Sequence, residues 1–357
     1  MTLLVAFLAA IIPFNAVPIV TNQAMAQARD RWLLCVLALT VLWLVVTGTY
    51  WLALMGLWFV LEWPRRGSTL LEHMVPWIAI GASWFMLRAI PDWCWEYIAE
   101  AWVVAAIWQS WLCVWNYWRM EWPKDNRPRL GNRTKGSFGS PVLTGIALSA
   151  MVPLSPVWLF PLVLPGVYLT FSFTCLLGIS IGLAWMYPPT TLPLFLGLLV
   201  LTLSMLFAKR QEYDVVGKAN WRNQRLMEWS PRGDSVDGWG ARLILDRLVW
   251  AELWGHRQWR GFGPGTVTDK ARQWGSRANR ELLSGEVHHD ALQHVYEYGV
   301  IGALAIVAFV VPIAMHLRVG DPFSAAWLVL LVVSMIHWPA RHPALGLMWL
   351  AISARLA

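Results

Sequence analysis

Charged side chains are scarce in this sequence. Asp, Glu, Lys and Arg make up 14% of its 357 residues, whereas 57% are hydrophobic and the mean hydropathy is +0.49. A soluble protein is nearer about a quarter charged, and apolar runs recur along most of this chain, so lipid is expected to surround most of it. The composition excludes a soluble enzyme, a secreted disulfide scaffold and a nucleic-acid-binding domain. The net charge of +7 therefore indicates anionic lipid or a charged substrate as the partner.

Cysteine is scarce too. Cys35, Cys94, Cys113 and Cys175 lie singly, without a C-x-x-C pair or a histidine at metal-binding spacing. Neither a disulfide framework nor a zinc site is expected, and the thiols are interpreted as apolar packing residues. Tryptophan, by contrast, is abundant, and its 27 copies are expected at the membrane–water interface and between packed helices.

The apolar runs predict an all-α polytopic integral membrane protein with about 12 transmembrane helices. Residues 3–20 are interpreted as a retained first span, because no basic region precedes them and no convincing cleavage site follows. The run 32–63 is too long for one span and is predicted to divide at TGTY (47–50) into two short helices. Further spans are predicted at about 73–90, 98–118, 142–155, 157–172, 173–188, 191–208, 291–315, 324–338 and 345–355.

Two polar segments interrupt these spans. Residues 119–141 are basic and rich in Gly, Pro and Asn, which predicts a loop. Residues 209–287 hold 24 of the chain's 49 charged residues, and RLILDRLVWAELW (242–254) within them has apolar residues at helical spacing. This second segment is predicted to be a large, partly helical loop over the membrane face. The single membrane domain is accordingly divided into four parts. These are the N-terminal helices (1–118), the basic loop with the central helices (119–208), the large loop (209–287) and the C-terminal helices (288–357).

The densest polar cluster at a span boundary is GEVHHDALQHVYEYGVIG (285–302). Asp290, His294 and Glu297 fall on one helical face and could present metal ligands, but His288 and His289 do not share that face, so no metal is predicted. A second interpretation is that these residues cap the helix and hydrogen-bond within the bundle. The third is catalytic, because an imidazole titrates near neutral pH and can take a proton from a hydroxyl.

A resemblance supports the catalytic interpretation. HHDALQHVYEYGVIG (288–302, the third motif) resembles the H-N-x-x-L-Q-x-x-x-E-x-G-x-x-G signature of the O-antigen ligase and O-antigen polymerase superfamily. The matching positions are His288, Leu292, Gln293, Glu297, Gly299 and Gly302.

Two further motifs precede it in family order. GARLILDRLVWAELWGHRQWRGFGPGTV (240–267, the second motif) is similar to the family's R-x-x-x-W helix and G-x-G-x-G turn, with Arg242 on the arginine and Gly261, Gly263 and Gly265 in the turn. RTKGSFGSPVLTGIALSAMVPL (133–154, the first motif) resembles the family's G-T-F-G-N-P-N loop. The resemblance therefore covers residues 133–302, whereas the preceding part matches only as a string of spans.

The resemblance implies a membrane glycosyltransferase of type C-like fold, in the bacterial inner (cytoplasmic) membrane, with the large loop and the active site on the periplasmic or outer side. Such an enzyme takes a glycan from an undecaprenyl-diphosphate carrier. It passes the glycan to a hydroxyl of lipid A core, of another carrier-linked chain or of a protein, as in lipopolysaccharide and other polysaccharide biosynthesis. Neither a metal nor a cofactor is implied.

The same resemblance implies roles for individual residues. His288 is the candidate base for the acceptor hydroxyl. Arg242 is the candidate for the donor diphosphate, because a bidentate guanidinium suits the negative charge that builds up on this leaving group. Arg260 and Arg133 are further candidates for the diphosphate. The supporting motif residues are His289, Gln293, Glu297, Gly261, Gly263 and Gly265.

Some of these residues also have an ordinary structural interpretation that needs no ligand. Arg242 could be a solvated charge on an amphipathic helix. The sequence GFGPG (261–265) could be a turn that ends a helix, since glycines bind phosphate only in a suitable backbone context. Arg133 could be an ordinary loop charge.

The sequence departs from the family pattern at three positions. Phe173 stands where the family commonly has the arginine of an S-R-G-type sequence, which removes an expected contact with the diphosphate. His289 and Ser140 stand where the family has asparagine. The arginines that could replace the missing contact are Arg222, Arg232, Arg257 and Arg260.

Two other functional classes stay open. In a transporter or flippase of a lipid-linked or amphipathic substrate, Asp290, His294 and Glu297 would form a proton or substrate relay, although the sequence has no inverted repeat. In a non-catalytic scaffold, neither Arg242 nor His288 would affect any activity. The bias of positive charge, which includes Arg65 and Arg66, would place the large loop in the cytoplasm, but long loops are exempt from that rule, so the family topology is preferred.

Overall fold

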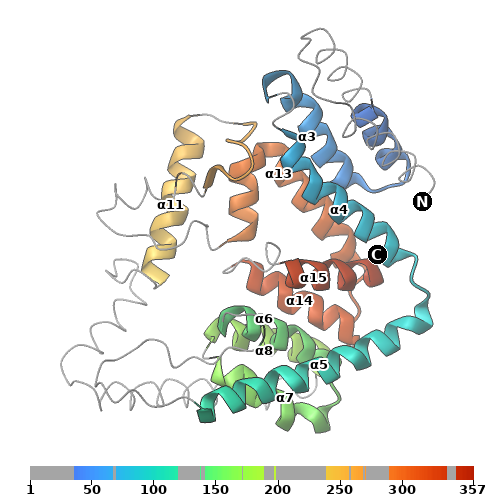
Figure 1. Ribbon diagram of the computed structural model, residues 1–357, viewed down its shortest axis with the longest axis vertical. Coiled ribbons are helices and arrows are strands. Elements are labelled where there is room, and N and C mark those ends of the chain that lie inside the picture. The colour runs from blue at the N-terminus through green and yellow to red at the C-terminus, as the bar shows by residue number, and fades with distance from the viewer. Residues whose placement is uncertain are drawn as a thin grey trace, which may run out of the picture.

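The computed structural model describes residues 36–66, 70–119, 137, 141–170, 172–188, 197, 239–256, 259–267, 270, 289–335 and 343–357. Within these residues every regular element is a helix and no strand occurs (Figure 1), so the predicted all-helical class is confirmed. The longer helices are, in chain order, Val36–Val46, α3 (Tyr50–Arg66), α4 (Leu71–Arg88), α5 (Asp92–Arg119), α6 (Pro141–Met151), α7 (Phe160–Leu169), α8 (Phe173–Met186), α11 (Trp239–Gly255), α13 (Asp290–Met315), α14 (Pro322–Ser334) and α15 (Pro343–Leu356).

Two of the described helices are long and apolar enough to cross a membrane. They are Asp92–Tyr117 within α5, with a mean hydropathy of 1.3, and Asp290–Met315, which is α13, with a mean hydropathy of 2.3. The other apolar helices have 10–17 residues. The set of about 12 spans stays a prediction, because the span expected at 3–20, and that at 191–208 except residue 197, lie outside the described residues.

The long apolar run 32–63 divides where the sequence predicted. The helix Val36–Val46 ends in a turn at Thr47 and Gly48, and α3 begins at Tyr50. Gly48 has a φ of 73°, which residues with a Cβ rarely adopt. The Thr47 hydroxyl donates to the Leu44 carbonyl over 3.1 Å. The two-helix prediction is therefore confirmed for the described part of this run.

The larger apolar core lies mainly between α5, α6, α7, α8, α14 and α15, in the lower half of Figure 1. Small residues let these helices approach closely, which is typical of helices packed in lipid. The Gly166 N–H of α7 donates to the Ser110 hydroxyl of α5 over 2.9 Å. A Cβ at Gly182 of α8 would lie 2.7 Å from Val329 of α14. Glycine thus fixes two of the closest helix contacts in this core.

A second packed group contains α3, α4 and α13, in the upper half of Figure 1. Its aromatic side chains interlock: the rings of Trp58 and Tyr298 meet edge to face at 4.9 Å, and the Trp77 Nε1–H donates to the Tyr298 hydroxyl over 3.0 Å. These contacts fix α13 against α3 and α4. They hold in place the helix that contains the third motif.

α13 consists of two helical segments. Gly299 has φ 65° and ψ −148°, which is not helical, and Figure 1 shows the two segments meeting at an angle. α11 packs along the first segment through a small cluster that includes Val249, Leu292 and Tyr296. The helix predicted at 242–254 is thereby confirmed. The rest of the loop up to residue 238 lies outside the described residues, and its side of the membrane stays a prediction.

Candidate functional site

The start of α13 is fixed by a side-chain cap. The Nδ1 of His289 accepts the Leu292 N–H over 3.2 Å, which satisfies one of the free N–H groups at a helix N-terminus. The capping interpretation therefore holds for His289. His288, the candidate base, directly precedes this cap and lies outside the described residues.

Residues 259–265, which we call the glycine turn, hydrogen-bond to the backbone groups at the break in α13. In a straight helix the Val300 N–H would donate to the Tyr296 carbonyl. Here the Val300 N–H donates to the Trp259 carbonyl over 2.8 Å, and Tyr296 and Glu297 accept instead from the Phe262 and Gly263 N–H groups, each over 2.9 Å. The turn thus takes the place of the missing helical partners, so these backbone groups stay hydrogen-bonded.

Positive φ values make this docking possible. Gly261, Gly263 and Gly265 have φ of 78°, 103° and 74°. A Cβ at Gly261 would collide with the Glu297 carbonyl, and one at Gly299 would collide with the Trp259 carbonyl. Glycine is therefore required on both sides of the contact by space as well as by backbone conformation.

The side chain of Glu297 also binds the turn. It is 2% exposed, and its Oε1 accepts from the Gly265 N–H over 3.3 Å and from the Gln293 Nε2–H over 3.2 Å. The N–H groups of Phe262, Gly263 and Gly265 therefore all donate to protein acceptors. The GFGPG sequence forms a clasp on α13, so those three N–H groups are not directed at a phosphate.

α3 holds the turn from the other side. The Arg66 Nη2–H donates to the Phe262 carbonyl over 2.9 Å, and the Trp58 Nε1–H donates to the Arg260 carbonyl over 2.9 Å. A Cβ at Gly263 would collide with the Arg66 guanidinium. Sequence reasoning used Arg66 only as an orienting charge. The sequence pattern that could have indicated a role for Arg66 is the pair Arg65–Arg66 at the end of an apolar run, one helical turn after Glu62.

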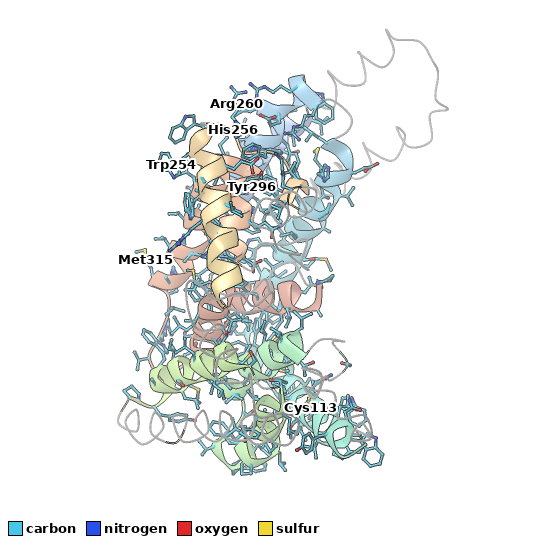
Figure 2. The ribbon with its side chains drawn as sticks, turned by 90° about the vertical axis from the view of Figure 1, so that its left-hand side faces the viewer. Cys113, Trp254, His256, Arg260, Tyr296 and Met315 are labelled. Carbon is cyan, nitrogen blue, oxygen red and sulfur yellow. The ribbon has the colours of Figure 1, made fainter. Side chains whose placement is uncertain are left out.

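The charges around the turn do not cancel. Glu62 is 3% exposed and pairs with Arg65, at 3.6 Å between Oε1 and Nη1, and with Arg66, at 3.4 Å between Oε2 and Nε. One carboxylate therefore faces two guanidinium groups. Arg260 adds a further exposed cation at this end of the molecule, which Figure 2 shows together with His256. Because the Glu297 carboxylate also binds the turn, the guanidinium groups of Arg65, Arg66 and Arg260 face two carboxylates here and leave one net positive charge.

An ion pair joins α11 to the segment after the turn. The Lys270 Nζ lies 2.7 Å from the Glu252 Oε1, and Glu252 interacts in turn with the Tyr296 hydroxyl. The Tyr296 ring stacks on Phe262 at 4.5 Å between centroids. α11, the turn and α13 thus form one packed unit.

α11 and the first segment of α13 begin at the same end of this unit. His256, just after α11, has its ring 6.1 Å from Phe262, so the C-terminal end of α11 lies at the break in α13. Its start therefore lies toward the start of α13, as Figure 1 shows. Arg242 is in the first turn of α11 and His288 immediately precedes α13, but the Arg242 side chain, like His288, lies outside the described part.

The first motif lies elsewhere in the fold. The Gln109 Nε2–H donates to the Ser137 hydroxyl over 2.6 Å, and the Ser137 N–H donates to the Gln109 Oε1 over 3.0 Å, which ties this loop to α5. Figure 1 places α5 and α6 in the opposite half from α3. Phe173 is the first residue of α8. Four arginines named above, Arg133, Arg222, Arg232 and Arg257, lie outside the described residues.

The face formed by Asp290, His294 and Glu297 is not arranged as a ligand set. The His294 ring lies 5.5 Å from the Trp77 ring and 4.6 Å from the Tyr298 ring, and Glu297 binds the turn. In the described part of the chain, no group of three or more His, Cys, Asp or Glu side chains could hold a metal ion. The chain matches no protein-family model, no curated protein sequence and no solved structure. Its function is therefore inferred from its own residues.

Proposed function

We propose that the protein is an integral-membrane glycosyltransferase that moves a glycan from an undecaprenyl-diphosphate carrier to a hydroxyl acceptor. The observation that most supports the proposal is the docking of the glycine turn onto the break in α13. Residues 259–265 of the second motif and 296–300 of the third are separated by 30 residues in the sequence, yet they share three backbone hydrogen bonds. Two motifs that carry the resemblance thus fold as one unit.

The chemistry assigned to this unit is a displacement at the anomeric carbon of the donor. His288 takes the proton of the acceptor hydroxyl, whose oxygen bonds to that carbon while the carbon–oxygen bond to the diphosphate breaks. The diphosphate leaves with the lipid and with both bonding electrons, and Arg242 stabilises its charge. Because guanidinium groups can hold part of the charge on this leaving group, the proposed reaction uses arginine rather than a metal.

The positive charge around the glycine turn fits an anionic donor. Arg65, Arg66 and the exposed Arg260 of the turn outnumber the carboxylates of Glu62 and Glu297 by one charge. Arg260 is our candidate for a replacement contact with the diphosphate, although Phe173 itself begins α8 in the other half of the fold. The choice among an O-antigen ligase, a polymerase and a protein glycosyltransferase depends on the acceptor.

The test is glycan transfer by purified full-length protein in proteoliposomes, with an undecaprenyl-diphosphate-linked glycan as donor. We expect His288→Ala to lower kcat by about 10²–10⁴-fold and Arg242→Ala by roughly 10²–10³-fold. His316→Ala removes an exposed histidine just after α13, and Arg247→Ala removes an exposed arginine of α11; both variants should keep full activity. Full activity of folded His288→Ala and Arg242→Ala proteins would overturn the proposal.

A transporter or flippase of a lipid-linked substrate is the second candidate. The observation that favours it is the broken helix with a buried Glu297, because transporters bind substrates and ions at discontinuous helices. Proton-gradient-dependent uptake into proteoliposomes, without glycan transfer and abolished by Glu297→Gln, would replace the glycosyltransferase proposal with this one.

A further inference from the structure

An apolar cavity of about 300 Å³ lies between the helix Val36–Val46, α3 and α4. The lining side chains include Leu37, Trp43, Met55, Phe59, Met74 and Trp77. Small-ligand sites have volumes of roughly 300–1,000 Å³, so this cavity is large enough for part of a ligand chain. The cavity is half open rather than enclosed, so a chain can enter it from outside. Its almost wholly apolar lining fits hydrocarbon.

One wall of the cavity contacts the third motif. The Trp77 ring lies 5.5 Å from the His294 ring, and its Nε1–H donates to the Tyr298 hydroxyl over 3.0 Å. Both partners lie on the first segment of α13, which directly follows His288. A chain in this cavity would therefore lie beside the segment that begins next to the proposed base.

The same helix carries positive charge beyond the cavity. Phe59 lines the cavity, and Arg65 and Arg66 follow six and seven residues later, roughly 10 Å further along the axis of α3. The Arg65 side chain is 59% exposed. An apolar slot with a cationic end matches an amphiphile that has an anionic head and a hydrocarbon tail.

We propose that this cavity holds the first isoprene units of the diphosphate-linked carrier before transfer, with the anionic head toward Arg65 at the glycine-turn end of α11, and that the diphosphate reaches Arg242, at the other end of α11, only for the reaction. The inference rests on the proposed function for the identity of the lipid, but it can be tested by binding alone. It assigns the carrier chain to α3, α4 and the helix before them, which lie outside the three motifs.

The experiment uses full-length protein in phosphatidylcholine nanodiscs and a polyprenyl diphosphate with a photoreactive group in its first isoprene unit. Mass spectrometry then maps the cross-linked peptides. Two matched probes carry the same reactive group, one on a polyprenol with a neutral head and one on the acyl chain of phosphatidylcholine. We expect the diphosphate probe to label residues 36–85 and to outcompete both matched probes there.

A graded pair of variants at Gly81 tests the cavity itself. A Cβ at Gly81 would lie 3.5 Å from Leu52, an ordinary contact, so Gly81→Ala should not change labelling. Gly81→Leu extends into the cavity and should lower labelling by about tenfold, the loss expected when about two methylene groups can no longer be buried. Ala105→Leu, on an exposed face of α5, is the control for added bulk.

The outcomes separate this inference from the proposed function. Arg65→Gln should weaken labelling by the diphosphate probe and leave the polyprenol probe unaffected. Labelling outside 36–85, equal labelling by phosphatidylcholine, or no effect of Gly81→Leu would each overturn the cavity site, even in an active transferase. Cavity labelling in a protein without transferase activity would support the lipid site and overturn only the catalytic proposal.

Discussion

Two alanine substitutions in the glycine turn should have different costs. Gly263 and Gly265 both have positive φ, of 103° and 74°, so alanine at either position meets a backbone penalty of about 1–2 kcal/mol, and this penalty is no smaller at Gly263, whose φ lies further from the left-handed helical region. They differ in their surroundings. A Cβ at Gly263 would collide with the Arg66 guanidinium, whereas a Cβ at Gly265 would have no described atom within 4 Å.

The difference can be worked out from the contacts of Arg66. Its guanidinium must move away from the Phe262 carbonyl when Gly263 becomes alanine. A hydrogen bond to a charged group is worth about 1.5–3 kcal/mol, and the lower end applies because the Arg66 side chain is 34% exposed. Gly263→Ala should therefore destabilise the docked turn by roughly 1.5–2 kcal/mol more than Gly265→Ala, a ratio of about 10–30 in the opening equilibrium.

Amide hydrogen exchange in nanodiscs measures this opening directly. The reporters are the N–H groups of Phe262 and Val300, which donate across the contact between the turn and α13. Adding Arg66→Ala to both variants should remove the excess effect of Gly263→Ala, because the colliding side chain is gone. Equal exchange in the two single variants, or an excess that persists without Arg66, would refute the reasoning.

Three further variants test the packing around the site. His289→Ala removes the cap of α13 and should cost about 1 kcal/mol, seen as faster exchange at Leu292 with no change at Val300. Glu297→Ala should destabilise the docked turn by about 1–3 kcal/mol, measured as faster exchange at Gly265. Glu297→Gln should have a smaller effect, because the amide oxygen of glutamine can still accept the Gly265 N–H. Equal exchange rates in the two variants would contradict the contact between Glu297 and Gly265. Gly166→Ala places a Cβ 2.5 Å from the Ser110 Cα and should lower stability by about 1–3 kcal/mol in thermal unfolding, whereas Gly81→Ala should leave it unchanged.

Sequence patterns were informative wherever the structure depends on neighbouring residues. The break at Thr47 and Gly48 could be predicted because an apolar run of 32 residues exceeds one span and contains a glycine between two threonines. The helix at 242–254 followed from its apolar spacing. Gln293, Glu297 and the turn glycines were singled out only by the resemblance, which implied no contact between them; the structure shows that Glu297 binds both Gly265 and Gln293.

The contacts of α3 could not be predicted in this way. Arg66 and Phe262 are 196 residues apart, and Trp58 and Arg260 are 202 apart. Nothing local distinguishes Arg66 from an arginine that merely flanks a span. Gly299 is similar, because glycine in an apolar run is compatible with a continuous helix, and the break exists only where a distant turn supplies replacement partners.

The clasp between the turn and α13 has a consequence for motion. The Val300 N–H and the Tyr296 carbonyl bind the turn when α13 is bent, and they could bind each other if it straightened. Straightening would detach the turn, expose its own N–H groups and release the Arg66 side chain from Phe262. A straight α13 would give Val300 and Tyr296 a different set of partners, so any molecule that preferred the detached turn would also favour a straight helix beside the site.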